Sequence, residues 1–283
     1  MPERMSAGPQ RVSPSWLARL HSRANQTPLQ PRVALWAGPH AIGSLLPEVG
    51  ARFAGALLQP ARAGWQVQGD LTQSLNQLAQ QMRQTRLGHV AHYWRDEQLG
   101  VYDEQGTHWG SVERGAVRPL GIATRAVHLV GRTPGGEVWV QQRALTKAND
   151  PGKWDTLMGG MIAAQDSLQT ALARETQEEA GLDINALTGL RHRGCVRITR
   201  PADDDVPGQP PAPVGLGYVV EAIDWFEATV PDGMVPLNQD GEVAQFECLS
   251  PAQLLQRLEQ EAFTLEAALI LVAALQGGAD HAI

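Results

Sequence analysis

The segment from Gly159 to Leu182 constrains this chain more than any other, because it predicts a loop that leads directly into a helix. Two adjacent glycines open the segment and interrupt regular structure. Asp166 or Ser167 can cap the N-terminus of the helix, and Gly181 is typical of the residue that follows a helix C-terminus. The fold must therefore place a strand, a loop and a helix one after another here.

The helix would carry three carboxylates on its apolar face. At about 100° per residue, one face holds both the apolar and the acidic side chains: Leu168, Ala171, Leu172, Glu175, Glu178 and Glu179. A solvated acidic patch is the simplest explanation. However, like charges four residues apart cost a few tenths of a kcal/mol, and the C-terminal end of a helix disfavours carboxylates. In a partly buried site each repulsion would rise to about 2–3 kcal/mol.

A positive charge should therefore lie among these acids. Arg174 can pair with Glu178 four residues further on, but one guanidinium does not balance three carboxylates. Hard divalent cations such as Mg²⁺ or Mn²⁺ prefer oxygen ligands, and Mg²⁺ commonly bridges to substrate phosphates. The pattern thus predicts a divalent-metal site on this helix.

The spacing of these residues resembles the Nudix box, which is a glycine, five residues, a glutamate, seven residues and then Arg-Glu-apolar-x-Glu-Glu-x-Gly-apolar. The matching positions in this chain are Gly160, Asp166, Arg174, Glu175, Thr176, Glu178, Glu179, Gly181 and Leu182. Two of them differ from the pattern, since Asp166 replaces the first glutamate and Thr176 replaces an apolar residue. Because the Arg-Glu and Glu-Glu pairs are intact, the resemblance implies an active enzyme.

The resemblance also implies a role for each box residue. Glu175, Glu178 and Glu179 would bind Mg²⁺ or Mn²⁺, and the Gly160 region would bring backbone carbonyls close to the metal. Arg174 would orient a glutamate through a charge-assisted hydrogen bond, with a weak surface ion pair as the alternative. Glu178, Glu175 and Arg174 would thus form the catalytic group, and the general base would be a box glutamate or a later acid.

Residues outside the box complete the expected site. Glu242, in "QDGEV", is the candidate for a later general base, and an ordinary edge-strand acid is the alternative. Arg143, Lys147 and Lys153 precede the box and are expected to contact the phosphates of the substrate. Arg143 is favoured because many Nudix proteins place a phosphate-binding arginine at the end of this strand.

Further segments are similar to one Nudix subfamily whose members carry an extra N-terminal domain and have relatives associated with thiamine pyrophosphokinase. The likeness runs from about Trp94 to Leu275 and is carried by "VAHYWRDEQLGVYDEQG", "VERGAVRPLGI", "RALTKANDPGKWDTLMGGMI" and "VPDGMVPLNQDGEVAQFECL". It implies hydrolysis of thiamine pyrophosphate, or of an oxidised or deaminated analogue, to the monophosphate and phosphate. The alternatives are another diphosphate, such as ADP-ribose or a nucleotide sugar, and a non-catalytic Nudix module that binds a ligand and regulates.

The remaining pattern predicts a smaller α+β domain over residues 1–118 and a Nudix domain over residues 119–283. The first is expected to hold helices at 13–23 and 71–84 and short strands at 89–94, 99–104 and 108–114. In the second, strands lie before and after the central helix, and helices at 251–261 and 264–275 follow. This order agrees with the α/β/α sandwich and mixed sheet that the Nudix resemblance implies.

Residues 201–213 lie between two predicted strands and contain three consecutive aspartates. Prolines and charges dominate this stretch, which favours an exposed loop over a metal site. Trp154 or Trp94 could line the organic end of a substrate, but buried packing is the simpler expectation for either.

Composition limits the partners and the compartment. With 23 Lys and Arg against 30 Asp and Glu, the net charge is −7, which argues against a general nucleic-acid-binding protein. An anionic substrate would need local cations or metal. The two cysteines, Cys195 and Cys248, imply no disulfide framework. The N-terminus lacks an apolar signal segment and the longest apolar run, Ala267–Leu275, is too short to cross a bilayer, so a cytoplasmic protein without a membrane partner is expected. The sequence leaves a homodimer open.

Overall fold

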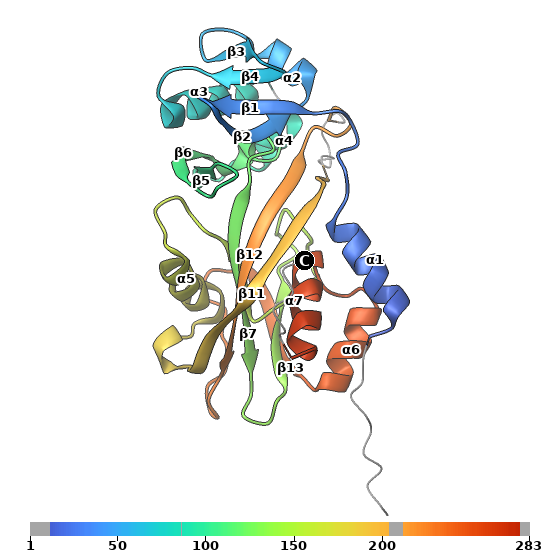
Figure 1. Cartoon of the computed structure of the whole chain (residues 1–283). Coiled ribbons are helices and arrows are strands. Elements are labelled where there is room, and N and C mark those ends of the chain that lie inside the picture. The colour runs from blue at the N-terminus through green and yellow to red at the C-terminus, as the bar shows by residue number, and fades with distance from the viewer. Residues whose placement is uncertain (1–11, 86, 204–211, 278–283) are drawn as a thin grey trace, which may run out of the picture.

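The computed structural model describes residues 12–85, 87–203 and 212–277. The chain forms an N-terminal lobe (residues 33–122) and a larger sheet lobe (residues 14–24 and 124–277), stacked end to end (Figure 1). The sheet lobe carries the glutamate-rich helix, so its layers determine where that helix lies.

The central sheet of the sheet lobe runs in the order β11-β12-β7-β8-β13, with β10 beside β7 and β9 beside β8. The strands are β7 (Thr124–Arg132), β8 (Val138–Arg143), β9 (Trp154–Asp155), β10 (Met158–Met161), β11 (Thr188–Pro201), β12 (Tyr218–Thr229) and β13 (Val243–Leu249). β12 is parallel to β7, whereas the pairs β11–β12, β7–β8 and β8–β13 are antiparallel. The sheet is therefore mixed, as the resemblance implied.

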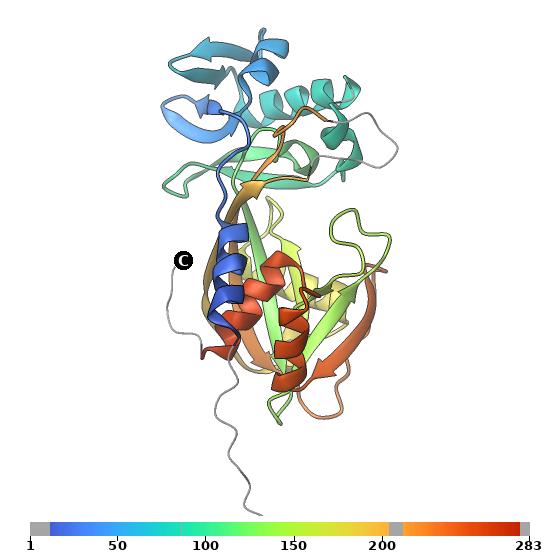
Figure 2. The ribbon, with the colours of Figure 1, turned by 90° about the vertical axis from the view of Figure 1, so that its right-hand side faces the viewer.

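Helices cover both faces of this sheet. α5 (Leu168–Ala180) lies on one face, and α6 (Pro251–Glu259) and α7 (Leu265–Leu275) lie on the other (Figures 1 and 2). A short 3₁₀ turn (Ile184–Ala186) follows α5. The predicted α/β/α sandwich is thus confirmed.

Alternate residues of β7 pack into the cores on the two faces of the sheet, because successive side chains of a strand point to opposite faces. Val127 and Leu129 belong to the core beneath α5, whereas Ala126 and Val130 belong to the core beneath α7. The strand is buried on both sides, which explains its nearly continuous apolar sequence.

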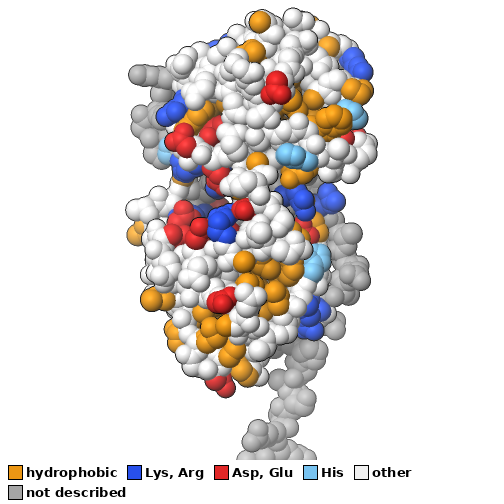
Figure 3. All heavy atoms as spheres, turned by 90° about the vertical axis from the view of Figure 1, so that its left-hand side faces the viewer, with side chains coloured by type: hydrophobic (Ala, Val, Ile, Leu, Met, Phe, Trp, Pro, Cys, Tyr) orange, Lys and Arg blue, Asp and Glu red, His pale blue; other side chains and the backbone are white. Residues whose placement is uncertain are grey.

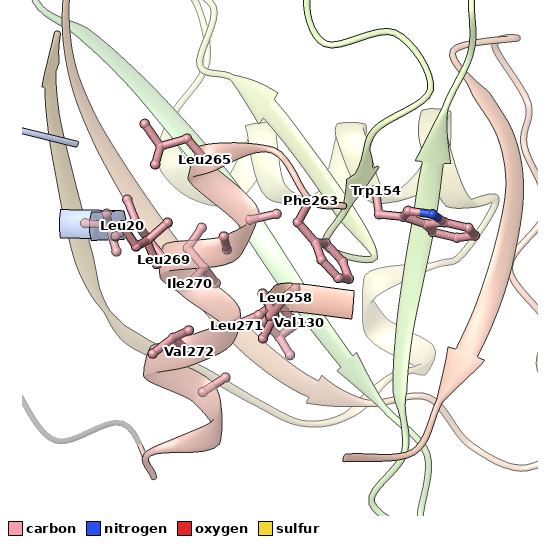
Figure 4. Close-up of a cluster of buried hydrophobic side chains, with 14 of the residues drawn as sticks. Leu20, Val130, Trp154, Leu258, Phe263, Leu265, Leu269, Ile270, Leu271 and Val272 are labelled. Carbon is pink, nitrogen blue, oxygen red and sulfur yellow. The ribbon is translucent and has the colours of Figure 1, made fainter. Parts of the chain in front are cut away.

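The core beneath α7 extends to a helix from the start of the chain. α7 is apolar almost all round, so it must be covered on every side. The sheet and α6 cover part of it (Figure 4), and α1 (Pro14–Ala24) covers another part through Trp16 and Leu20. The apolar stripe of α1 indicated a buried contact, but the sequence did not indicate that the contact lies in the sheet lobe.

The N-terminal lobe is an α+β unit, as predicted. One sheet runs in the order β2-β1-β4-β3 and a hairpin pairs β5 with β6. The strands are β1 (Val33–Ala37), β2 (His40–Leu45), β3 (Leu58–Ala61), β4 (Gly64–Val67), β5 (Gln98–Tyr102) and β6 (His108–Glu113); the helices are α2 (Pro47–Arg52), α3 (Leu71–Gln84) and α4 (Gly88–His92), with a 3₁₀ turn at Arg114–Ala116. The sequence predicted α3, β5 and β6 but not the sheet of β1 to β4.

The strand predicted at residues 89–94 is wrong, since most of this stretch forms helix α4. Its backbone turns because Val90 N–H donates to the Leu87 carbonyl at 2.9 Å. Gly115 then packs so closely that a Cβ there would lie 2.7 Å from the Val90 carbonyl oxygen. Tertiary packing thus overrides the short alternating pattern of this segment.

Arg32 joins the two lobes. Its guanidinium donates to the carbonyls of Gly215 and Leu216 at 3.1 and 2.8 Å, at the loop that enters β12. It also donates to the carbonyls of Ser44 and Pro119 in the N-terminal lobe at 2.6 and 2.8 Å. Leu216 itself is fully buried in the apolar core of the N-terminal lobe. The sheet lobe is therefore anchored in the core of the other lobe.

Within the described ranges, no helix combines the length and the apolar character that crossing a bilayer requires. Of the predicted exposed loop at 201–213, residues 204–211, which include Asp204 and Asp205, lie outside the described residues.

Candidate active site between α5 and the N-terminal lobe

A polar cavity of about 320 Å³ lies where the two lobes meet. Helix α5 and strand β10 line one side, the start of α7 and the ends of β11 and β12 line another, and the N-terminal lobe contributes the roof. Acidic and basic side chains gather at this waist on the α5 side of the surface (Figure 3). We take this cavity as the candidate active site.

Helix α5 begins and ends where the sequence predicted. Ser167 Oγ accepts from the Thr170 N–H at 3.1 Å, and Thr170 Oγ1 accepts from the Ser167 N–H at 2.8 Å. Gly181 ends the helix with a φ of 63°, a conformation that favours glycine. Thr176, where the box has an apolar residue, is fully buried and donates its hydroxyl to the Leu172 carbonyl at 2.6 Å. This bond satisfies the one polar atom that the substitution adds.

Glu179 is the most deeply buried acid of the box. Its Oε2 accepts hydrogen bonds from Gln141 Nε2 at 2.8 Å and from the Gly159 N–H at 3.0 Å. Burial raises the pKa of Glu179 to about 8, although both hydrogen bonds act in the opposite direction. A carboxylate that is buried against neutral donors is stabilised by a nearby cation.

Arg174 lies among the other acids. Its guanidinium contacts Asp166 Oδ2 at 2.9 Å, Glu175 Oε1 at 3.0 Å and Glu178 Oε2 at 2.8 Å. Asp166, which replaces the usual glutamate of the box, therefore helps to hold Arg174 in place. Burial raises the pKa of Glu175 to about 7, even though Arg174 acts against this shift.

The two glycines of β10 allow close approach to this cluster. A Cβ on Gly160 would lie 2.3 Å from Cδ of Glu175, and a Cβ on Gly159 would lie 2.3 Å from Cε1 of His128. Any larger residue at either position would displace the neighbouring side chain or the strand. Glycine at position 160 therefore leaves the space that Glu175 occupies against β10.

The donor chemistry of the cluster fits a hard divalent cation. Glu175, Glu178 and Glu179 supply carboxylate oxygens on one side of the cavity, and β10 lies directly against Glu175. In the part of the chain that is described, however, no three His, Cys, Asp or Glu side chains already form a ligand group. Arg174 contacts both Glu175 and Glu178. A bound cation would compete with Arg174 for these two carboxylates.

Replacement of Gly160 by alanine is expected to lower kcat by about 100-fold or more, because the new Cβ forces Glu175 away from its position. Steady-state assays with saturating Mg²⁺ will measure the effect, and circular dichroism will show whether the fold is retained. Gly135→Ala is a matched control, since a Cβ there lies 3.6 Å from its nearest contact. Equal activity in Gly160→Ala and wild type would contradict the placement of Glu175 in the site.

Arg143, at the end of β8, lines the cavity as a fixed guanidinium. Its Nε and Nη2 donate to the Asn149 carbonyl at 3.2 and 3.0 Å, and its Nη1 lies 3.4 Å from Asp155 Oδ2. The side chain is only 14% exposed. This arrangement leaves Arg143 well ordered for a phosphate contact.

Lys147 and Glu242 also line the cavity and form an ion pair with each other. Partial burial raises the pKa of Glu242, but the bond from Lys147 and the charges of Lys147, Arg114 and Arg143 together outweigh it, so the pKa lies below the ordinary value. Glu242 is therefore ionised at neutral pH and can accept a proton.

Lys153 lies elsewhere, because its Nζ donates to the Glu261 carbonyl at 2.7 Å and it does not belong to the cavity lining. The neighbouring Trp154 is 9% exposed, packs in the core beneath α7 and lies under the guanidinium of Arg257. Trp94 also lies outside the lining; its ring packs against Arg83, and its Nε1 donates to Asp96.

The cavity contains further charged residues that the sequence did not indicate. The N-terminal lobe contributes Glu97, Arg114 and Arg118, and the sheet lobe contributes His128, Asp155, Arg200, Glu221 and Glu266. These residues are scattered over the chain and share no spacing, so no motif connects them. The polar residues within otherwise apolar strands, such as His128 and Glu221, were the only available signal.

A model of the NUDIX domain matches residues 123–269, which is just over half of the chain. The chain is similar to an uncharacterized Nudix hydrolase of Pseudomonas aeruginosa, with 37% identity over 86 residues, which cover 30% of this chain and 51% of that protein. It is also similar to the chloroplastic Nudix hydrolase 24 of Arabidopsis thaliana, with 28% identity over 157 residues, which cover 54% of this chain and 40% of that protein. The chain thus spans about half the length, or less, of these relatives.

Among solved structures, the chain is similar to DR0079 from Deinococcus radiodurans, with 21% sequence identity and a TM-score of 0.47 over 64% of this chain and 99% of that one. The match of the NUDIX domain model covers the sheet, α5, α6 and the start of α7. Five box residues of these elements line the cavity within that region: Gly160, Arg174, Glu175, Glu178 and Glu179. The chain therefore belongs to the Nudix family.

Proposed function

We propose that this protein is a divalent-metal-dependent pyrophosphohydrolase that cleaves a small-molecule diphosphate. The observation that carries the proposal is that one cavity is lined by the box acids, by the cations Arg143 and Lys147, and by the ionised Glu242. Acids for a metal, cations for phosphates and a proton acceptor are the groups that hydrolysis of a phosphoanhydride requires.

Each group has a distinct task in this mechanism. A Mg²⁺ or Mn²⁺ ion held by Glu175, Glu178 and Glu179 would neutralise phosphate charge and make bound water more acidic. Arg143, fixed by Asn149, would orient the phosphates through its remaining donors.

Glu242 would take a proton from the attacking water as the water oxygen bonds to phosphorus and the bridging P–O bond breaks. Lys147 would first exchange its bond with Glu242 for a phosphate oxygen, which frees the carboxylate to accept that proton. The leaving phosphate carries away the electron pair of the broken bond.

We further propose thiamine pyrophosphate, or an oxidised or deaminated analogue, as the substrate. The resemblance that supports this substrate is carried by segments that also supply the cavity. Arg143, Lys147, Asn149 and Asp150 come from "RALTKANDPGKWD", and Glu242 comes from "DGEV". The products would be thiamine monophosphate and inorganic phosphate.

A side-by-side comparison of kcat/KM will test the substrate. Thiamine pyrophosphate, oxythiamine pyrophosphate, ADP-ribose and UDP-glucose are assayed with Mg²⁺. We expect at least one thiamine compound to exceed ADP-ribose and UDP-glucose by about tenfold or more, which is ~1.4 kcal/mol in transition-state binding. The reverse order by the same factor would exclude the thiamine substrate and leave the reaction class intact. Binding of one compound without hydrolysis of any would instead favour a regulatory Nudix module.

A further inference from the structure

Two arginines and two glutamates of the cavity lining come from elements other than α5 and β10. Arg118 comes from the N-terminal lobe, Arg200 from the end of β11, Glu221 from β12 and Glu266 from the first turn of α7. We call these four residues the α7-side subsite. None of them belongs to the box or to the residues given a role in the reaction above.

Glu221 is the most buried member of the subsite, at 9% exposed. Its Oε1 accepts a hydrogen bond from Thr124 Oγ1 at 3.1 Å. Burial raises the pKa of Glu221, the charge of Glu266 raises it further, and Arg118 acts in the opposite direction. A carboxyl group in such a position costs free energy unless it gains a further partner.

The arginines of the subsite do not fully satisfy these acids. Arg200 Nη2 lies 3.9 Å from Glu266 Oε1, which is an ion pair but too long for a hydrogen bond. Arg200 Nε is buried and has no hydrogen-bond partner among the described residues. Arg118 lies over the ring of Tyr93, with 5.5 Å from its Cζ to the ring centroid, and donates weakly to Asn149 Oδ1 at 3.4 Å.

The formal charges of the two arginines and two glutamates of the subsite cancel. A second phosphate is therefore disfavoured next to Glu221 and Glu266. A lipid tail is also disfavoured, because Ala126 and Met161 are the apolar side chains among the described lining residues. A ligand that fits these four side chains is a flat ring. It would offer N–H donors to the carboxyl groups, and acceptor atoms or a π-face to the guanidinium groups.

We propose that the α7-side subsite binds a nitrogen heterocycle that carries an exocyclic amine, and so selects the organic end of the substrate. This inference rests on the proposed function, since it assigns the phosphates of the same molecule to Arg143 and Lys147. Glu221 and Glu266 are binding residues here and take no part in bond cleavage. A ligand that pairs with a buried polar group of the site binds roughly ten- to a hundredfold more tightly than an analogue that leaves this group unpaired.

The test measures binding of the heterocycle without its phosphates. Thiamine and cytidine, which both carry an exocyclic amine, are titrated by calorimetry into wild type, Glu221→Gln and Glu227→Gln. Glu227 is the matched control, because it is a buried glutamate of the same strand that pairs with Arg132 and Arg191 and lies outside the cavity lining. Thermal midpoints establish that each variant is folded.

We expect wild type to bind at least one of the two heterocycles, Glu221→Gln to raise its Kd by tenfold or more, and Glu227→Gln to match wild type. In turnover assays, Glu221→Gln should raise KM for the heterocyclic diphosphate at least ten times more than for isopentenyl diphosphate, which has no ring. Absence of binding at millimolar concentration, or an unchanged Kd in Glu221→Gln, overturns the subsite. If binding depends on Glu221 while no diphosphate is hydrolysed, the subsite stands and the proposed function fails.

If Glu221→Gln does not fold, Glu266→Gln replaces it in the same measurements. Glu266 is 18% exposed and lies in the first turn of α7, where loss of its charge disturbs the core less. A rise of tenfold or more in the Kd of Glu266→Gln would support the subsite, and an unchanged Kd in that variant would overturn it.

Discussion

Glutamine in place of Glu178 or Glu179 is expected to lower kcat by about 100- to 10,000-fold, because each loss removes a carboxylate from the proposed metal site. Metal ions contribute several kcal/mol to stabilisation of the transition state, and each 1.36 kcal/mol corresponds to about tenfold in rate. Steady-state phosphate release at saturating Mg²⁺ measures the effect. The folds should be unchanged, since glutamine has nearly the same shape as glutamate.

The matched control for this measurement is Glu48→Gln, an exposed glutamate of the N-terminal lobe. It loses the same charge at a residue that does not line the cavity, and it should retain wild-type turnover. Wild-type turnover in both Glu178→Gln and Glu179→Gln would exclude the acids of α5 as the metal site. A loss that higher Mg²⁺ concentrations reverse would support it further.

The metal-free protein should become less stable as the pH rises from about 5 to 8. Glu175 and Glu179 have folded-state pKa values of about 7 and 8, against 4.5 for the free side chain. Between these values the unfolded chain has already released its protons while the folded protein retains them, so a rise in pH favours unfolding. At 1.36 kcal/mol per pKa unit, Glu179 alone contributes a loss on the order of 3–5 kcal/mol.

Chemical denaturation in a chelating buffer at several pH values measures this loss. Mg²⁺ should restore stability most strongly at pH 8, because it binds the ionised carboxylates. Glu179→Gln should show a flatter pH profile and a higher stability than wild type at pH 8 without metal. A metal-free stability that is constant from pH 5 to 8 would show that the two carboxylates are not strained by burial.

The sequence predicted the box helix well because local signals determine it. Ser167 and Gly181 fix its ends, and the spacing of Glu175, Glu178 and Glu179 places them on one face whatever the rest of the chain does. The mixed sheet and its helical layers were likewise predictable, since the strands of the sheet lobe are long and apolar. Even the two departures from the box have local explanations, in the bonds of Asp166 to Arg174 and of Thr176 to Leu172.

No comparable local signal indicates the residues that the N-terminal lobe, β11, β12 and α7 contribute to the cavity. Arg118 and Glu221 are more than a hundred residues apart, and only the packing of the two lobes brings them to the same space. The strands β1 to β4 were missed because they are short, and turn residues interrupt their pattern. Lys153 has the side chain of a phosphate ligand, but its ammonium donates to the backbone carbonyl of Glu261, a contact between residues distant in sequence.

The insertion of Leu216 into the core of the N-terminal lobe has a consequence for where this protein can be divided. The NUDIX domain model begins at residue 123, yet Leu120, Ile122 and Leu216 are buried together in one cluster. A fragment cut at that boundary would present Leu216 to water and would leave the carbonyls of Gly215 and Leu216 without the guanidinium of Arg32. The segment that defines the family is therefore shorter than the cooperative unit in which this chain folds.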